Sequence, residues 1–369
     1  MDKSLESFTT PKDYKRQSHE YEDLWGPDGW LLFVACDSGK DLAMKVKKEY
    51  INFLKKKESN MDVLLLDGNM TRYFEDHTTI PRLPSHVANS NAFVFQNATE
   101  NISGRTPGEN FNQLLQMVRT LKVHGASNIN VVMPYLTHPR QEKPSFMQRE
   151  ATLAKLDADL LKTAGTNTIL TYHPHSLATQ GFYEPEIRFV YLSGLDLFMD
   201  VFKEEKNKDN VIVFSTDAGG VDFTKPYSDF MGIEYGVTIK HRAKQKKTDT
   251  LGLAGEIQGK SKAIIIDDET ATLGSFIGTT ERLVEDHRFH EIYWGVSHMK
   301  LKEDCIGRLK KANKEYNVKE VHITDTIAQT KKLLDLDFII SHSIAERFAR
   351  TINRMHYGKS VSQIFYKPD

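Results

Sequence analysis

Residues 262–279 read KAIIIDDETATLGSFIGT, an apolar run followed by two carboxylates and a segment rich in Thr, Gly and Ser. The apolar run at 263–266 contains the β-branched residues expected of a strand that is buried on both faces of a parallel sheet. Asp267 and Asp268 follow directly, and open α/β sheets bind their ligands at the carboxyl ends of such strands. The stretch therefore predicts a strand ending at 266, two carboxylates, a turn and a helix over 276–284.

The predicted turn has the composition of a phosphate-binding loop. Thr270, Thr272, Gly274 and Ser275 supply hydroxyls and a permissive backbone. The N-terminal amides of the helix that follows attract phosphate, and the carboxylates suit sugar hydroxyls. The segment thus favours a site for a phosphorylated sugar, and the alternative is an ordinary β-α turn with an acidic N-cap.

Composition limits the classes of function. The 369 residues suffice for two domains. The 49 basic and 50 acidic residues leave no global field for nucleic acid or an anionic membrane, so neither partner is expected. Only Cys36 and Cys305 are present, and no apolar run has the length of a membrane span, which favours the cytoplasm. Residues 1–26 are mostly polar and are predicted to form an extension.

From residue 29 onward, apolar strands alternate with amphipathic segments. This order predicts an α/β fold with parallel sheets flanked by helices. The helical segments are 41–57, 110–124 and 149–163, and the predicted strands are 30–35, 63–67, 91–96, 130–134, 168–172, 211–215, 236–239, 263–266, 291–296, 320–324 and 338–341. We place one domain at 27–190 and a second at 191–369, whose last segment can return to pack on the first; the charged run 203–210 is an alternative border.

Two strand ends in the first half carry residues suited to phosphate or metal. After 130–134, prolines fix a loop in which Arg140 and Lys143 offer a planar fork and a point charge for phosphates. After 168–172 come His173 and His175, whose spacing alone is weak evidence for a metal. A solvated basic turn and packing histidines are the alternatives.

Two further strand ends lie in the second half. Asp217 precedes Gly219 and Gly220, which permit close approach of the backbone to a ligand or simply form a tight turn. Residues 240–247, KHRAKQKK, hold five cations and suit a mobile lid over polyphosphate, or a solvated surface. No aromatic residues are interleaved for base stacking, which argues against nucleic acid.

In order and spacing, these elements resemble the ribose-phosphate diphosphokinases, or phosphoribosyl pyrophosphate synthetases. The likeness runs from about residue 29 to the end, where GKSVSQIF at 358–365 is similar to the family's G-x-S-V-S-x-L-F. It implies two phosphoribosyltransferase-type α/β domains and a homo-oligomer, either a dimer or a hexamer. It also implies transfer of the β,γ-diphosphate of MgATP to the anomeric hydroxyl of ribose 5-phosphate, with release of AMP.

The resemblance also implies roles for particular residues. Lys240 and Arg242 match the catalytic K-x-R, and His175 and Asp217 match the metal-linked positions. Residues that match the ATP-binding motifs are Phe74, Asp76 and Thr78, in a loop that contacts the adenine of a neighbouring subunit, together with Arg140 and Gln141. The ribose-phosphate loop is matched by Asp267, Asp268, Thr270, Ala271, Thr272, Leu273, Gly274 and Ser275.

The sequence departs from the family mainly in this last loop. Ala271 stands where the pattern has a third aspartate, and Leu273 adds bulk where it has a small residue. Thr78, His173 and Thr216 replace Glu, Asp and Pro of other motifs. These changes leave open a ribose with a larger 5′ group, such as ADP-ribose, as the acceptor, and also a non-catalytic nucleotide-binding relative. A phosphoribosyltransferase is the alternative from another reaction class.

Overall fold

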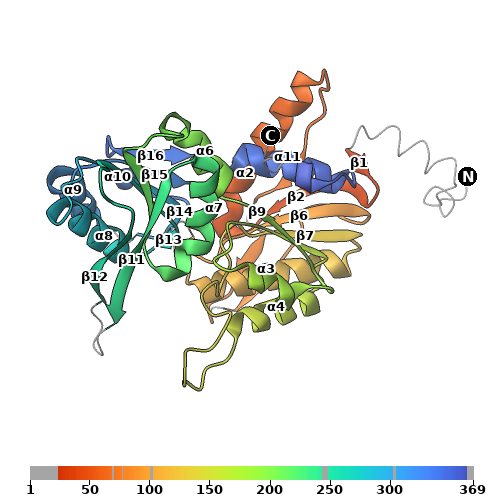
Figure 1. The fold of residues 1–369 in the computed structure, drawn as a ribbon. Helices are drawn as coiled ribbons and strands as arrows, with labels where there is room; N and C mark the ends of the chain where they lie inside the picture. Colours follow the sequence, from red (N-terminus) through yellow and green to blue (C-terminus); the bar gives the residue numbers. More distant parts are fainter. Residues whose placement is uncertain are drawn as a thin grey trace, which may run out of the picture.

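The computed structural model describes residues 24–68, 70–76, 78–99, 103–242, 248–301 and 305–363, with the backbone alone for 240–242, 248–251 and 363. Two seven-stranded sheets lie side by side, and helices cover their faces (Figure 1). The strands are parallel apart from β1 in the first sheet and β12 in the second. The expected α/β fold with parallel sheets is confirmed.

The first sheet has the order β1-β2-β6-β7-β8-β9, with β3 beside β2. Helices α3 and α4 pack on one face and α2 on the other. The strands are β1 (Trp25–Gly26), β2 (Gly29–Ala35), β3 (Leu64–Leu66), β6 (Ser90–Phe95), β7 (Asn128–Val132), β8 (Thr168–Tyr172) and β9 (Arg188–Leu192), and the helices are α2 (Lys40–Lys56), α3 (Pro107–Val123), α4 (Leu153–Ala164) and α5 (Gln180–Tyr183).

The second sheet has the order β12-β11-β10-β13-β14-β15-β16, with β13 at its centre. Its strands are β10 (Val211–Ser215), β11 (Glu234–Arg242), β12 (Thr248–Gly255), β13 (Lys262–Thr270), β14 (Glu291–Met299), β15 (Val318–Thr324) and β16 (Ile339–His342). The later helices are α6 (Leu195–Val201), α7 (Val221–Met231), α8 (Gly274–Glu285), α9 (Ile306–Glu315), α10 (Lys331–Leu334) and α11 (Ala345–His356).

Helix α11 returns from the second sheet to the first. Its Phe348 and Ile352 are fully buried in the core that contains Phe33 of β2. At the end of α11, His356 Nε2 lies 2.9 Å from the carbonyl oxygen of Leu24. The C-terminal helix thus ties the two sheets together.

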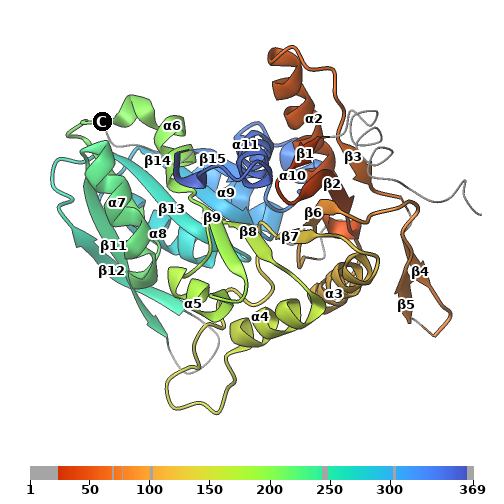
Figure 2. The same cartoon turned by 90° about the vertical axis from the view of Figure 1, so that its right-hand side faces the viewer.

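A small hairpin, β4 (Thr71–Tyr73) and β5 (Thr79–Pro81), stands away from both sheets (Figure 2). Tyr73, the last residue of β4 before the hairpin loop, contacts the turn after β2, because its hydroxyl lies 2.9 Å from a carboxylate oxygen of Asp37. Arg105 stacks on the Tyr73 ring and pairs with the same carboxylate at 3.1 Å. The loop at the tip of the hairpin contains Phe74, Asp76 and Thr78.

The structure corrects several of the predicted boundaries. Strands β11 and β14, predicted at 236–239 and 291–296, span 234–242 and 291–299. Strand β13 does not end at 266 but continues to Thr270, because Glu269 and Thr270 still pair with His298 and Met299 of β14. Residues 24–26, predicted as part of a polar extension, belong to the first sheet, since Leu24 is buried and Trp25 pairs with Trp30. Residues 1–23 of the predicted extension lie outside the described residues. No helix in the described ranges is long and apolar enough to cross a membrane.

Candidate active site

The two carboxylates of β13 lie on an extended backbone at the carboxyl end of the second sheet. Thr216, after β10, donates its hydroxyl to Asp267, and the backbone N–H of Asp268 donates to an oxygen of Asp267 at 2.9 Å. Burial and the neighbouring charge of Asp268 raise the pKa of Asp267 well above its usual value. Thr216 and the backbone thus fix the orientation of the Asp267 side chain beside Asp268.

His175 reaches Asp268 from the other sheet, in the loop after β8. Its Nδ1 lies 2.6 Å from Oδ2 of Asp268. Burial alone would raise the pKa of Asp268, but the hydrogen bond and charge of His175 hold it well below its usual value. The same hydrogen bond raises the pKa of His175. The predicted metal-linked histidine and the predicted sugar-binding carboxylate are thus in contact.

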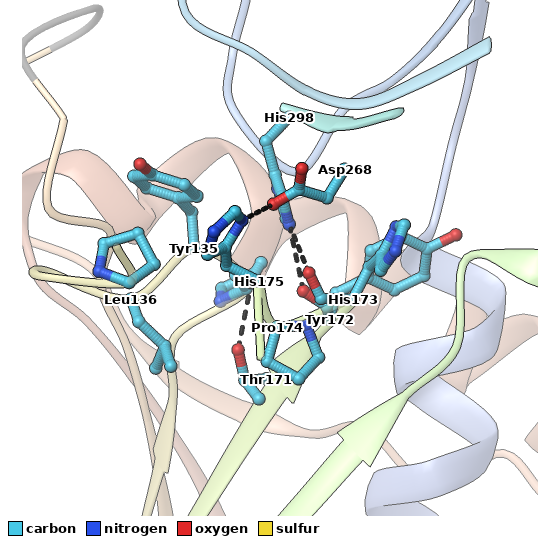
Figure 3. A pocket seen from close by; sticks show the side chains of 11 residues that line it. Tyr135, Leu136, Thr171, Tyr172, His173, Pro174, His175, Asp268 and His298 are labelled. Atoms are coloured by element: carbon cyan, nitrogen blue, oxygen red, sulfur yellow. Dashed lines mark hydrogen bonds and ion pairs between the residues drawn. The ribbon is translucent and has the colours of Figure 1, made fainter. Parts of the chain in front are cut away.

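A narrow hollow lies beside this contact, between the two sheets. Figure 3 shows His175 between Tyr135 and Asp268, with His298 behind them. His298 is buried, and its Nε2 lies 3.0 and 3.1 Å from the carbonyl oxygens of Tyr172 and His173. Burial lowers the pKa of His298 to about 4, so this ring is neutral near pH 7 and fixes the loop that presents His175.

Glu269 joins Arg140, which the sequence singled out, to Lys300 and Tyr135, which it did not. Its side chain is fully buried, yet Lys300 Nζ lies 2.7 Å from one of its oxygens and Arg140 pairs with the other. The hydroxyl of Tyr135 donates to Glu269 at 2.6 Å. Arg140 was predicted to bind ATP, and the structure anchors it on the strand that carries Asp267 and Asp268. The signal in the sequence that could have drawn attention to Glu269 was its position at the end of an apolar strand.

The loop that carries Arg140 is also fixed by contacts with α4. His138 Nδ1 lies 2.8 Å from a carboxylate oxygen of Asp157 on α4. The backbone N–H of Gln141 donates to the carbonyl of His138 at 3.1 Å, and the carbonyl of Gln141 accepts from Ala154. Both side chains predicted to bind ATP in this loop, those of Arg140 and Gln141, are exposed.

The turn that follows β13 opens helix α8, as expected for an anion-binding loop. Thr270 accepts the backbone N–H of Leu273 at 3.2 Å, while Ala271, Thr272 and Gly274 are exposed. Leu273 has a left-handed backbone with φ 61°, and its side chain is fully buried in the core under the turn. The expectation that Leu273 adds bulk to the loop is therefore wrong, since its side chain points into the protein.

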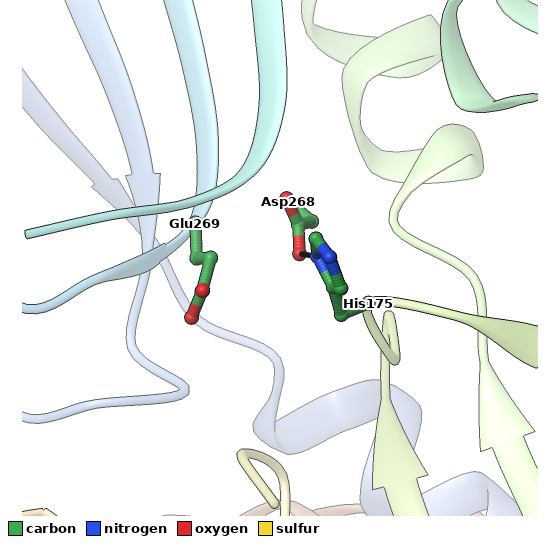
Figure 4. A group of neighbouring side chains, drawn as sticks. All are labelled: His175, Asp268 and Glu269. Carbon is green, nitrogen blue, oxygen red and sulfur yellow. Dashed lines mark hydrogen bonds and ion pairs between the residues drawn. The ribbon is translucent and has the colours of Figure 1, made fainter. Parts of the chain in front are cut away.

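One group of three side chains could hold a metal ion among the residues that the structure describes. The ligand atoms of His175, Asp268 and Glu269 all lie within 4.8 Å of one another, and Figure 4 shows the three side chains together. Two carboxylates and an imidazole suit a divalent cation, although Mg²⁺ prefers oxygen and keeps several waters. Asp217 lies outside this group. It caps the turn Ala218–Gly220 after β10 and accepts the N–H of Gly219 at 3.0 Å.

The remaining predicted residues lie on two hairpins. In the β4–β5 loop, Asp76 accepts from the hydroxyl of Thr78 at 2.7 Å, and Phe74 is exposed with Arg72 over its ring. Lys240 and Arg242 lie at the far end of β11, paired with Thr250 and Thr248 of β12. Their side chains, and residues 243–247 of the predicted lid, lie outside the described residues.

Comparison with known proteins agrees with this arrangement. The profile for the N-terminal domain of ribose phosphate pyrophosphokinase matches residues 31–165, and that for the phosphoribosyl synthetase-associated domain matches 194–366. A ribose-phosphate pyrophosphokinase of Caldanaerobacter subterraneus subsp. tengcongensis is 32% identical over 294 residues, which are 79% of this chain and 88% of the relative. That of Halalkalibacterium halodurans is also 32% identical, over 84% of this chain and 98% of the relative.

The fold agrees as well. The crystal structure of phosphoribosylpyrophosphate synthetase from Mycobacterium smegmatis superimposes with a TM-score of 0.72 at 24% identity, and the match covers 88% of this chain and 98% of that one. The fold defines an α/β protein with two parallel-stranded sheets flanked by helices, and its site lies where loops of the first sheet meet β13 of the second. The chain belongs to the ribose-phosphate pyrophosphokinase family.

Proposed function

We propose that this protein transfers the β,γ-diphosphate of ATP to the anomeric hydroxyl of ribose 5-phosphate. The acceptor oxygen forms a bond to the β-phosphorus, the bond from that phosphorus to the α,β-bridging oxygen breaks, and AMP leaves. The observation that carries the proposal is the meeting of two loops of the first sheet with β13, where Arg140 pairs with Glu269 and His175 contacts Asp268. A nucleotide-binding loop and an acceptor loop so placed can align donor and acceptor.

The residues divide between the two substrates. Asp267 and Asp268 suit the ribose hydroxyls, and the turn at 270–275, in which Ala271, Thr272 and Gly274 are exposed, suits the 5′-phosphate. Arg140 and Gln141 suit the phosphates of ATP. The β4–β5 hairpin, whose loop carries Phe74, Asp76 and Thr78, stands away from both large sheets (Figure 2), which supports a role for these residues in binding the adenine of a neighbouring subunit in a homo-oligomer.

Catalysis rests mainly on positive charge. Charge spread over a transferring phosphoryl group is stabilised by cations, with little covalent work for the protein. Lys240 and Arg242, at the end of β11, are proposed to supply these cations. A divalent cation such as Mg²⁺ supplies further charge when bound, and His175 and Asp217 are the residues proposed to hold it, with Asp268 beside His175.

ADP-ribose is the competing acceptor. Two departures from the family pattern, Ala271 and Leu273, pointed to an acceptor with a larger 5′ group. The burial of Leu273 removes one of these two arguments. Only the exposed Ala271 remains, and the named relatives favour ribose 5-phosphate. The test measures AMP release from ATP and Mg²⁺ with ribose 5-phosphate or ADP-ribose offered separately. We expect AMP with ribose 5-phosphate; no AMP with either acceptor contradicts a diphosphokinase.

A further inference from the structure

The Glu269 carboxylate pairs with two cations that come from different sheets. Lys300, which follows β14, and Arg140, which follows β7, each contact one of its two oxygens. One carboxylate balances the charge of only one of them. The neighbouring carboxylate, Asp268, is itself paired with His175, so one positive charge of the two cations remains for another anion.

The positive charge lies on the accessible side of this cluster. The Glu269 side chain is 0% exposed, whereas Arg140 and Lys300 are 55% and 25% exposed. Arg140 has five N–H donors and Lys300 has three, so each can keep a bond to Glu269 and still donate to another oxygen. The buried Glu269 carboxylate and the remaining N–H donors of the two more exposed cations together form an anion-binding site.

The cluster adjoins the site rather than a remote surface. Tyr135, whose hydroxyl contacts both Glu269 and Lys300, lines the same hollow as His175 and Asp268 (Figure 3). The backbone fixes Lys300 there as well, because its N–H donates to the carbonyl of Thr270 at 2.8 Å, at the start of the acceptor turn. Lys300 is thus within the region where the phosphates of both substrates are expected.

We propose that Lys300 binds a substrate phosphate, and that Glu269 is the positioning residue that directs Lys300 and Arg140 toward it. This inference rests on the proposed function, because that function assigns Arg140 to ATP. The phosphate belongs either to ATP or to the 5′ end of the acceptor, which share the same chemistry. Separate titration of the two substrates identifies which one Lys300 contacts.

The test compares Lys300→Met and Lys300→Arg with the wild type, using the full chain. We expect Lys300→Met to raise the KM of one substrate about tenfold, because a charge-assisted hydrogen bond is lost. Lys300→Arg should recover most of that affinity, because it keeps the cation. Lys310→Met, which removes an exposed lysine of α9, serves as the control and should match the wild type. The melting temperature of each variant shows whether a loss of activity is caused by unfolding.

Glu269→Gln tests the positioning role separately. It keeps the shape but removes the competing charge, so kcat should fall about tenfold while the KM for ATP stays level or falls. If Glu269 served only stability, Glu269→Gln would lower the melting temperature without lowering kcat relative to KM. This result would overturn the positioning role. A Lys300→Met enzyme with wild-type constants for both substrates overturns the phosphate contact. A wild-type enzyme that releases no AMP contradicts the proposed function instead.

Discussion

His175 Nδ1 lies 2.6 Å from Oδ2 of Asp268, although the two residues are 93 positions apart and come from different sheets. The contact joins the end of β8 to β13 and places an imidazole beside the proposed ribose-binding carboxylates. Arg140 and Glu269 repeat the connection a short distance away. The site therefore depends on how the two sheets are docked, and residues in either sheet should affect the same reaction.

Lys240→Ala and Arg242→Ala should each lower kcat much more than they lower ATP affinity. The reason is that their contacts are proposed to form chiefly in the transition state, where the charge on the transferring group is redistributed. Steady-state kinetics together with ATP binding by calorimetry measures the two effects. Lys225→Ala, an exposed position on α7, is the control. An equal loss of binding and rate would rule out the assignment.

Ala271→Asp should improve the use of ribose 5-phosphate if this position sets the choice of acceptor. The residue is exposed in the turn before α8, so a carboxylate can be added there without repacking the core. The ratio of kcat/KM for ribose 5-phosphate to that for ADP-ribose is the measurement. An unchanged ratio means that the determinant lies elsewhere.

Leu273→Ala should destabilise the protein by about 2–5 kcal/mol, because it leaves a cavity in the core beneath the turn. Acceptor preference should not change, since the side chain does not enter the loop. Chemical denaturation and acceptor kinetics together make the test. A shift in preference at unchanged stability would show that Leu273 faces the substrate.

His175→Ala should raise the Mg²⁺ concentration needed for half-maximal activity by about tenfold or more. It removes the partner that orients Asp268 and one member of the three-residue group. His124→Ala, at the end of α3, is a control outside the site. A variant with the wild-type Mg²⁺ requirement would separate His175 from the metal.

Stability should fall on acidification partly because of His322. Its ring lies between His342 Nε2 at 3.0 Å and Glu320 Oε2 at 2.9 Å, and burial lowers its pKa to about 4. The unfolded chain, with a histidine pKa of about 6.5, therefore binds more protons between about pH 6.5 and 4. The contribution is fully present above that window and is lost as the pH falls, by at most about 1.4 kcal/mol per pH unit.

The measurement for His322 is the free energy of unfolding from pH 7 to pH 4.5. His322→Asn should show a flatter decline than the wild type, whereas His287→Asn, at an exposed position, should follow the wild type. Parallel curves for His322→Asn and the wild type would mean that this ring titrates normally in the folded protein.

Much of the fold followed from local patterns. The apolar runs at 168–172 and 211–215 are strands with the predicted ends, because they are buried on both faces and bounded by polar turns. Strands β9 and β12 were not predicted. RFVYL of β9 does contain an apolar run, FVYL, that could have indicated a strand at the edge of the sheet, whereas TDTLGLAG of β12 has two glycines and no such run.

The site was predictable in its residue types but not in its pairings. Asp268 and His175 could each be selected from strand ends, whereas their contact depends on the docking of two sheets. Glu269 and Lys300 escaped notice because a charged residue beside a strand is usually solvated. Their burial and pairing arise only when β13 continues past Asp268 and β14 brings Lys300 alongside.

The most direct test of the central claim follows the β-phosphorus of ATP. ATP labelled at that atom is incubated with Mg²⁺, ribose 5-phosphate and the protein, and the labelled products are separated. Diphosphate transfer predicts that the label is found in a diphosphate group attached through oxygen to carbon 1 of the sugar phosphate. The amount of this product should equal the amount of AMP formed. Label found only in ATP, ADP or inorganic phosphates, with none on the sugar, would contradict the account.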